Sequence, residues 1–441
     1  MSLERPRHSR SFVPLPVLEN LESLCSGPER NALRSCALVA VQHLLETTGS
    51  LFESLIALGL PPRNIFVLGK LYSASKSVQQ RLRSLGVNVF ENGIPERFGS
   101  YCDQFTIDVK RLWGEVLDRG VLDRVDRIVI LDDGGYAITQ TPKSVLSLLP
   151  VHAVEQTMSG IEFTKNNCPL VPIVDVASSA AKTLLEPKLI WDAVQARIAS
   201  AITDAPSFGV VGLGNIGSAV AVALSKSNRP VFLFDKEDRK IPSLSTPIFC
   251  GDVSQVFQNA SVIFGCTGSD FLEGESWWGG LEGQKTLISC SSHDQEFRAV
   301  LRQARPAHVR NLSHLFATVK VATGNGELSV LRGGFPINFD GSIESVKAMD
   351  IQLTRGLLLA GTLQAISNAG NGHIGREPLS PTSQKRVVSC WFKSGNRKGS
   401  YPLSVSSIFA NEELIQAHSR DAEYQRPEQP LRSTASLCRP A

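Results

Sequence analysis

One segment constrains the fold of this chain more than any other, because a short apolar run leads directly into three regularly spaced glycines. Residues 208–211 form the apolar run, and a helix-compatible segment at 218–225 follows the glycines. A second apolar run, 231–234, ends at Asp235. The loop between the first run and the helix reads Gly212, Leu213, Gly214, Asn215, Ile216, Gly217. Strand, G-x-G-x-x-G, helix, strand and acidic residue in this order predict a parallel βαβ unit.

Each of these residues has a physical role if the unit binds a dinucleotide. Gly212 permits a tight turn, Gly214 lets the backbone approach a pyrophosphate, and Gly217 allows the helix to pack closely on the strand. The N-terminus of the helix, at Asn215 and Ile216, offers free N–H groups to the phosphates. A lone G-x-G-x-x-G could mark only a tight turn, but the full order of elements favours binding.

The acidic residue indicates which dinucleotide we expect. Asp235 stands roughly 20 residues after the glycines, where a carboxylate accepts hydrogen bonds from ribose hydroxyls. Its charge would repel the additional phosphate of NADP, so the predicted cofactor is NAD. Arg239 and Lys240 follow closely and could weaken this preference.

Two later strand ends supply further candidate cofactor residues. Cys266, Thr267 and Gly268 close a strand of the same sheet, where the nicotinamide half of the cofactor normally lies, and Cys290 closes the next one. From spacing alone, an ordinary turn after a strand explains the Cys266 segment equally well.

Apolar runs of strand length alternate with helical patterns in two series along the chain. The first series is at 65–68, 87–90, 127–131 and 170–176, and the second is at 208–211, 231–234, 248–250, 262–266 and 287–290. This alternation predicts an α/β fold with two doubly wound parallel-sheet domains. Helical spacing of apolar residues predicts one helix over 38–59, which carries His43, and a long helix over 346–365.

The expected domains are a substrate domain whose first part is 1–190, a Rossmann NAD-binding domain at 191–344, and a return helix at 345–370. Beyond it, 371–441 is expected to be a polar, partly disordered C-terminal tail, above all at 418–441.

Composition excludes several classes of function. The 441 residues include 45 Lys+Arg and 42 Asp+Glu, for a net charge of +3, which argues against a nucleic-acid partner. The nine cysteines are odd in number and lack any C-x-x-C pair, which argues against a disulfide framework or a metal site and favours a reduced compartment. Since no signal peptide and no run of eighteen uncharged apolar residues occurs, we expect a cytoplasmic protein without a membrane partner.

Several short motifs of the first domain share a family pattern. They are Asp132-Asp133-Gly134-Gly135 after a strand, residues 154–160 (VEQTMSG), residues 171–176 (VPIVDV) followed by Lys182, and His43 in QHLLETTGSLFESLIALG. The order of these motifs and the separations between them, from about residue 36 to residue 365, resemble those of the S-adenosylhomocysteine hydrolase family. In such proteins the cofactor domain is inserted between two parts of the substrate domain.

The resemblance implies a reaction and a role for each matching residue. Bound NAD would oxidise a ribose 3′-hydroxyl, the ketone would acidify the neighbouring C–H, the 5′ substituent would leave, water would add, and the hydride would return. Lys182 would assist removal of the hydroxyl proton, and His43 and Asp133 would be acid/base groups at the 5′ side. The matching substrate positions are Asp132, Gln156, Thr157, Glu186 and His293. The substrate would be a small molecule, and the protein a homo-oligomer, dimer or tetramer.

Without the motifs, each of these residues has a simpler explanation. A lone histidine in an apolar segment is usually a core residue, a lysine on a helix is usually solvated, and paired aspartates before glycines often only shape a turn.

The departures from the family fall on substrate positions. Leu45 and Thr47 replace the residues that help to read adenine, and Gln156 and Tyr136 replace acids. Glu186, Pro187 and Cys290 differ from the family residues at their positions, and residues 340–343 replace its G-H-P-S turn.

Three interpretations follow, of which we favour the first. It is a diverged enzyme that uses NAD to oxidise a ribose-type hydroxyl of a nucleoside thioether or a related small molecule. The second is a non-catalytic, NAD-binding regulatory paralogue. The third is a two-domain NAD-dependent hydroxy-acid dehydrogenase, for which Arg298 or Arg302 near His293 would be the substrate-binding arginine.

Overall fold

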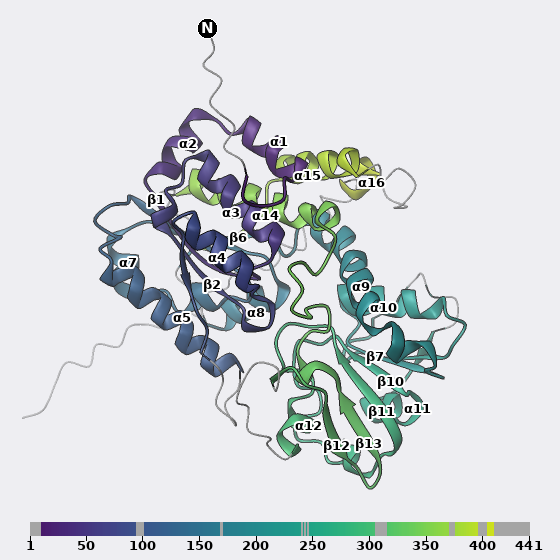
Figure 1. Ribbon diagram of the computed structural model, residues 1–441. Helices are drawn as coiled ribbons and strands as arrows, with labels where there is room; N and C mark the ends of the chain where they lie inside the picture. Colours follow the sequence, from purple (N-terminus) through teal and green to yellow (C-terminus); the bar gives the residue numbers. More distant parts are fainter. Residues whose placement is uncertain are drawn as a thin grey trace, which may run out of the picture.

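A computed structural model describes residues 10–93, 101–167, 171–239, 241, 244, 247–304, 315–369, 375–395 and 404–409. The described chain folds into two lobes, each built on its own seven-stranded sheet (Figure 1). Both lobes have the doubly wound α/β architecture that the alternating pattern predicts. Among the described helices, none combines the length and the apolar character that a membrane span requires.

The first sheet is parallel throughout, in the order β14-β6-β5-β4-β1-β2-β3. Its strands are β1 (Cys36–Gln42), β2 (Ile65–Gly69), β3 (Asn88–Phe90), β4 (Arg127–Asp132), β5 (Val151–Glu155), β6 (Ile173–Asp175) and β14 (Arg376–Pro378). The chain leaves the central strand β1 toward β2 and reaches β4 on the other side only later. The carboxyl ends of β1 and β4 therefore form a topological switch point, where open α/β sheets place their sites.

Alternate residues of the central strands enter two different cores, because successive side chains of a strand point to opposite faces. Leu38 and Ala40 of β1 pack on one face, and Val39 and Val41 pack on the other. The first face is covered by α1 (Pro16–Leu24), α2 (Gly27–Arg34), α3 (Glu46–Leu58), α4 (Lys76–Ser84), α14 (Ala348–Asn368) and α15 (Pro381–Ser394). The second is covered by α5 (Tyr101–Asp118), α6 (Tyr136–Thr139), α7 (Lys143–Leu148) and α8 (Met158–Asn166).

The second sheet has the order β12-β13-β11-β10-β7-β8-β9 and is parallel except for the antiparallel pair β12–β13. Its strands are β7 (Phe208–Val211), β8 (Val231–Phe234), β9 (Ile248–Phe249), β10 (Val262–Gly265), β11 (Glu282–Ser289), β12 (Val319–Ala322) and β13 (Asn325–Val330). Its helices include α10 (Asn215–Ser225), α11 (Val253–Asn259) and α12 (Arg298–Gln303). The switch point of this sheet lies between β7 and β10.

Two connections join the lobes. The long helix α9 (Ala180–Thr203) leaves the first lobe and leads into β7, as Figure 1 shows in teal. After β13 the chain returns and enters α14, which packs against β4, β5 and β6. The second lobe is thus an insertion within the first, and the carboxyl ends of both sheets face the space between the lobes.

Two expectations from the sequence are wrong in detail. Residues 38–42 belong to strand β1 rather than to a helix, so His43 lies in the loop between β1 and α3. The segment after 371 is not only a polar tail, because β14 joins the first sheet and α15 packs on α14 through the fully buried Trp391. A short helix, α16 (Val405–Phe409), packs on α15, and the tail at 418–441 lies outside the described residues.

Candidate functional site

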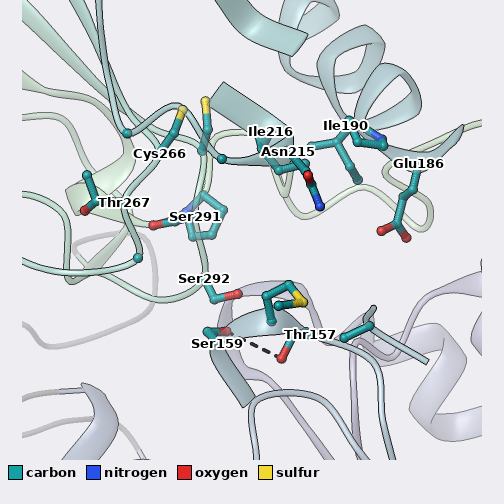
Figure 2. Close-up of a pocket in the computed structure, with 18 of the residues that line it drawn as sticks. Thr157, Ser159, Glu186, Ile190, Asn215, Ile216, Cys266, Thr267, Ser291 and Ser292 are labelled. Carbon is teal, nitrogen blue, oxygen red and sulfur yellow. Dashed lines mark hydrogen bonds between the residues drawn. The ribbon is translucent and has the colours of Figure 1, made fainter. Parts of the chain in front are cut away.

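A cleft of about 900 Å³ lies between the lobes and is lined by residues of both. Figure 2 shows Thr157 and Ser159 of the first lobe on one side and Asn215, Ile216 and Cys266 of the second lobe on the other. Most of the residues that the sequence predicts as site residues line it. They are His43, Asp133, Gln156, Thr157, Lys182, Glu186, Gly212, Gly214, Asn215, Ile216, Asp235, Cys266, Thr267, Gly268 and Cys290.

Asp132, Gly217 and His293 are not among the residues that line the cleft. The carboxylate of Asp132 is buried, and its two oxygens accept the backbone N–H groups of Asp133 and Ile138, at 2.9 Å each. A Cβ atom at Gly217 would lie 1.8 Å from the carbonyl oxygen of Gly212. Asp132 and Gly217 therefore shape the loops of the site instead of facing a ligand.

His293 of the second lobe is enclosed by aromatic rings of the first lobe. It adopts a left-handed conformation (φ 69°), and its ring lies 5.4 Å from both Tyr101 and Tyr136 and 6.3 Å from Tyr72, measured between centroids. Burial lowers the pKa of His293 well below its usual value, which keeps the imidazole neutral. This histidine is a contact between the lobes at the edge of the site.

The three glycines of the loop differ in what surrounds them. Gly212 has φ +90°, and a Cβ atom there would lie 2.7 Å from the carbonyl carbon of Cys266. Gly212 and Gly217 are thus required by the packing of the protein itself. A Cβ atom at Gly214 would meet no atom within 4 Å, so nothing in the described chain explains a glycine at this position.

The helix N-terminus beside Gly214 has unused hydrogen-bond donors. The backbone N–H groups of Gly214, Asn215 and Ile216 donate to no residue that the structure describes. These groups and the positive end of the dipole of α10 face the cleft, next to the open space at Gly214. The loop has the features of an anion site for phosphates.

Asp235 closes this half of the cleft. Its Oδ2 accepts the backbone N–H of Leu213 at 2.5 Å, and its Oδ1 accepts that of Glu237 at 2.9 Å. Arg239 lies 3.6 Å from Asp235 Oδ2 and 2.6 Å from Glu237 Oε2, so two carboxylates balance its charge. Lys240 lies outside the described residues.

The carboxyl ends of β10 and β11 form the inner wall of the cleft. Thr267 Oγ1 and the backbone N–H of Gly268 both donate to the carboxylate of Glu296, at 3.0 and 2.6 Å. Burial raises the pKa of Glu296 to about 7. A hydrogen bond with Cys290, together with burial, raises the pKa of Cys266 well above its usual value, so Cys266 is a thiol and not a thiolate nucleophile.

A buried charge cluster lies across the cleft, at the switch point of the first sheet. His43 Nε2 is 3.2 Å from Asp133 Oδ2, and Asp133 Oδ1 forms an ion pair with Lys70, whose side chain is fully buried. Gln156 Nε2 also donates to Asp133. Burial alone would raise the pKa of Asp133, but the nearby charge of Lys70 and the hydrogen bonds from His43 and Lys70 hold it well below its usual value.

The ring of His43 is held on three sides. Besides Asp133, it contacts Ser73 Oγ at 2.5 Å through Nδ1, and it stacks on Phe339 with ring centroids 4.3 Å apart. Burial lowers the pKa of His43, although the charge of Asp133 opposes this shift. The imidazole is therefore neutral at physiological pH, with one nitrogen able to donate and the other able to accept.

A second ion pair faces the cleft from the first turns of α9. Lys182 Nζ pairs with Glu186 one helical turn later, and Glu186 Oε1 accepts the hydroxyl of Thr354 at 2.7 Å. Both side chains of the pair are largely buried, at 13% and 12% exposed. Lys182 and the glycine loop therefore line the same cleft from different lobes.

The charged residues of the site that were missed from the sequence include Lys70 and Arg355. Lys70 directly follows strand β2, and a lysine at the carboxyl end of a buried strand was an available signal. Arg355 lines the cleft from the apolar helix α14, where a single arginine among leucines was the only signal. The described residues contain no cluster of three or more histidine, cysteine or acidic side chains arranged to hold a metal ion.

No protein-family model matches this sequence. Solved structures with a low overall similarity include a 2-hydroxyacid dehydrogenase of Ketogulonicigenium vulgare Y25, with TM-score 0.36, 13% identity and coverage of 74% of this chain and 96% of that chain. Another is the apo-structure of D-lactate dehydrogenase from Escherichia coli, with TM-score 0.33, 13% identity and coverage of 73% and 96%. The A chain of dipicolinate synthase from Bacillus subtilis has TM-score 0.32, 10% identity and coverage of 62% and 86%.

Sequence similarity is much higher to two proteins of Mycobacterium tuberculosis. They are the uncharacterized protein Rv0104 of strain H37Rv and the uncharacterized protein MT0113 of strain CDC 1551. Each is 31% identical over 358 residues, which cover 80% of this chain and 68% of the relative. The chain belongs to the same family as these mycobacterial proteins.

Proposed function

We propose that this protein is an NAD-dependent oxidoreductase that oxidises a hydroxyl group of a small molecule held between its two lobes. One observation carries the proposal: a single cleft brings a phosphate-type loop at Gly214 together with the Lys182–Glu186 and His43–Asp133 pairs. When bound, NAD would supply the hydride acceptor.

The residues present suit that cofactor. The free N–H groups at Gly214, Asn215 and Ile216 would hold the pyrophosphate, and the space at Gly214 would let it approach the backbone. Asp235 would accept the ribose hydroxyls, and together with Glu237 it disfavours the additional phosphate of NADP. Thr267 and Gly268, held by Glu296, would border the nicotinamide.

Lys182 is the candidate base for the hydroxyl proton. Its Nζ faces the cleft and pairs with Glu186, so Lys182 would pass one of its own protons to that carboxylate before it accepts the hydroxyl proton. Thr354 fixes Glu186 from the opposite helix, so the pair has a defined position. Removal of the hydroxyl proton and departure of the hydride together convert a secondary alcohol into a ketone.

His43 is the candidate for a second proton transfer. The neutral imidazole shares Nε2–H with Asp133, which Lys70 keeps ionised, and Nδ1 contacts the hydroxyl of Ser73, so the ring would accept a proton at Nδ1 through that hydroxyl and Asp133 would stabilise the resulting cation. A ketone acidifies the neighbouring C–H, which gives such a base a proton to remove. The resemblance to S-adenosylhomocysteine hydrolases favours a ribose-type hydroxyl of a nucleoside thioether as the substrate.

The test is to incubate the purified 441-residue chain with NAD and, separately, adenosylhomocysteine, adenosine and a panel of small hydroxy acids. NADH absorbance and free thiol are followed together. NADH formation with any of these substrates supports the proposal, and thiol release with adenosylhomocysteine supports hydrolysis as well. Tight NAD binding without turnover of any of them would favour a regulatory protein instead.

A further inference from the structure

The helix α14 places a buried arginine in the cleft without an ionic partner. Arg355 is 4% exposed, yet it is one of the residues that line the cleft. Its Nε donates to Thr47 Oγ1 at 3.0 Å. Within the described chain, its two terminal nitrogens donate to no residue and its guanidinium forms no ion pair. Arginine is almost never this deeply buried unless it is paired, so the missing partner requires an explanation.

The nearby carboxylates are already engaged by other groups. Glu186 pairs with Lys182 and accepts from Thr354, and Asp133 pairs with Lys70 and His43. Glu344 accepts the backbone N–H groups of Thr47 and Ser345, at 2.9 and 3.1 Å. These three acids act on Arg355 from a distance and oppose the lowering of its pKa by burial. None of them occupies the two terminal nitrogens.

Arg355 lies beside both residues proposed to transfer protons, Lys182 and His43. Its neighbour on α14 is Thr354, which fixes Glu186 and, through it, Lys182. On the other side, Arg355 is close enough to His43 for its charge to contribute to the lowered pKa of that histidine, whose main cause is burial. The arginine therefore lies beside both pairs.

We propose that Arg355 binds an anionic group of the substrate, a carboxylate or a phosphate. A guanidinium offers two parallel N–H donors that match either oxyanion, and in a largely buried site such a contact also fixes orientation. An anion at Arg355 would place the rest of the molecule, including its hydroxyl group, along the cleft toward Lys182. The inference rests on the proposed function and narrows its substrate class to molecules that carry an oxyanion in addition to the reacting hydroxyl.

In the test, isothermal titration calorimetry measures binding of two non-oxidisable probes, malonate and inorganic phosphate, to the 441-residue chain saturated with NAD. We expect at least one probe to bind. The identity of the probe that binds shows whether the oxyanion of the substrate is a carboxylate or a phosphate. Arg355→Met should weaken that binding by about 30-fold or more. Arg119→Met is the matched control, because Arg119 is an exposed arginine of the first lobe that pairs with Glu115, and it should leave probe binding unchanged.

The NAD titration of each variant separates failure of this inference from failure of the proposed function. The glycine loop lies in the other lobe, so Arg355→Met should bind NAD as the wild type does. Should Arg355→Met not fold, Arg355→Lys keeps the charge but loses the paired donors, and it should weaken probe binding severalfold with unchanged NAD affinity. If NAD binds but neither probe does, or if both arginine variants bind the probes like the wild type, the inference is overturned. Absence of NAD binding would instead overturn the proposed function.

Discussion

Nε2 of His43 lies 3.2 Å from Oδ2 of Asp133, and the other oxygen of the same carboxylate forms an ion pair with Lys70. The sequence separates Lys70 from Asp133 by 63 residues, and the parallel sheet brings them together at the carboxyl ends of β2 and β4. The positive charge of the buried Lys70 compensates the negative charge of Asp133, so His43 can stay neutral while Asp133 stays ionised. This arrangement makes His43 a candidate base. Removing either Lys70 or Asp133 alone should lower the stability of the folded protein.

Replacing Lys70 with Met should destabilise the protein by about 3–5 kcal/mol, because it leaves Asp133 buried without compensation. The double variant Lys70→Met/Asp133→Asn should be more stable than Lys70→Met alone. Urea unfolding of the two variants and the wild type measures both effects. A Lys70→Met variant as stable as the wild type would show that the ion pair is not needed in the fold.

Replacing Lys182 with Met should abolish oxidation of any substrate found, with a loss of about 100-fold or more, because it removes the candidate base. NAD affinity should remain. Lys188→Met is the control, since Lys188 lies on the same helix and pairs with Asp192 at the surface. Steady-state rates and NAD titrations of both variants are compared. Activity that survives in Lys182→Met would remove this residue from the mechanism.

The chemistry around the glycine loop could be predicted from the sequence because its signals are local. Gly212 and Gly217 are demanded by contacts within one βαβ unit, and Asp235 follows the next strand. Of the helix predicted over 38–59, only residues 46–58 are helical, and 38–42 belong to β1, which is buried on both faces and whose unbroken apolar run does not alternate. The periodicity of α3 was extended backward over it, and this placed His43 on a helix.

Arg355 and Lys70 show what a single sequence does not reveal. Arg355 donates to Thr47 from 308 residues away, and no local pattern near either residue signals this contact. The strands and helices follow from periodicity, whereas the charges that meet at the ends of the strands depend on the order of strands in the sheet. The family resemblance placed His293 at the substrate, whereas the structure encloses this histidine among tyrosines.

Replacing Asp235 with Asn should reduce the preference for NAD over NADP by about tenfold, because the amide oxygen can still accept from Leu213 while the negative charge is lost. Glu282→Gln, on an exposed part of the same lobe, should leave the preference unchanged. Dissociation constants for the two dinucleotides are measured for each variant. An unchanged ratio in Asp235→Asn would show that this charge does not select the cofactor.

Stability should decrease as the pH rises from about 4.5 toward 7 through the contribution of Glu296. Burial raises its pKa from 4.5 in the unfolded chain to about 7 in the fold. Between these values the folded state holds the proton that the unfolded state has lost, so a rise in pH favours unfolding, by up to about 3 kcal/mol. Glu296→Gln should lose this part of the pH dependence. Thermal unfolding across the pH range compares the two proteins, and identical slopes would contradict the assignment.

Calorimetric titration of NAD into the wild type and the Gly214→Ala variant tests the central claim most directly. A methyl group at Gly214 meets no atom of the described residues within 4 Å, so the variant should unfold like the wild type but bind NAD at least about tenfold more weakly. Gly217→Ala, which would clash with Gly212, should lose stability as well. Absence of heat with the wild type, or equal NAD affinity in Gly214→Ala, would contradict the assignment of this loop to a dinucleotide.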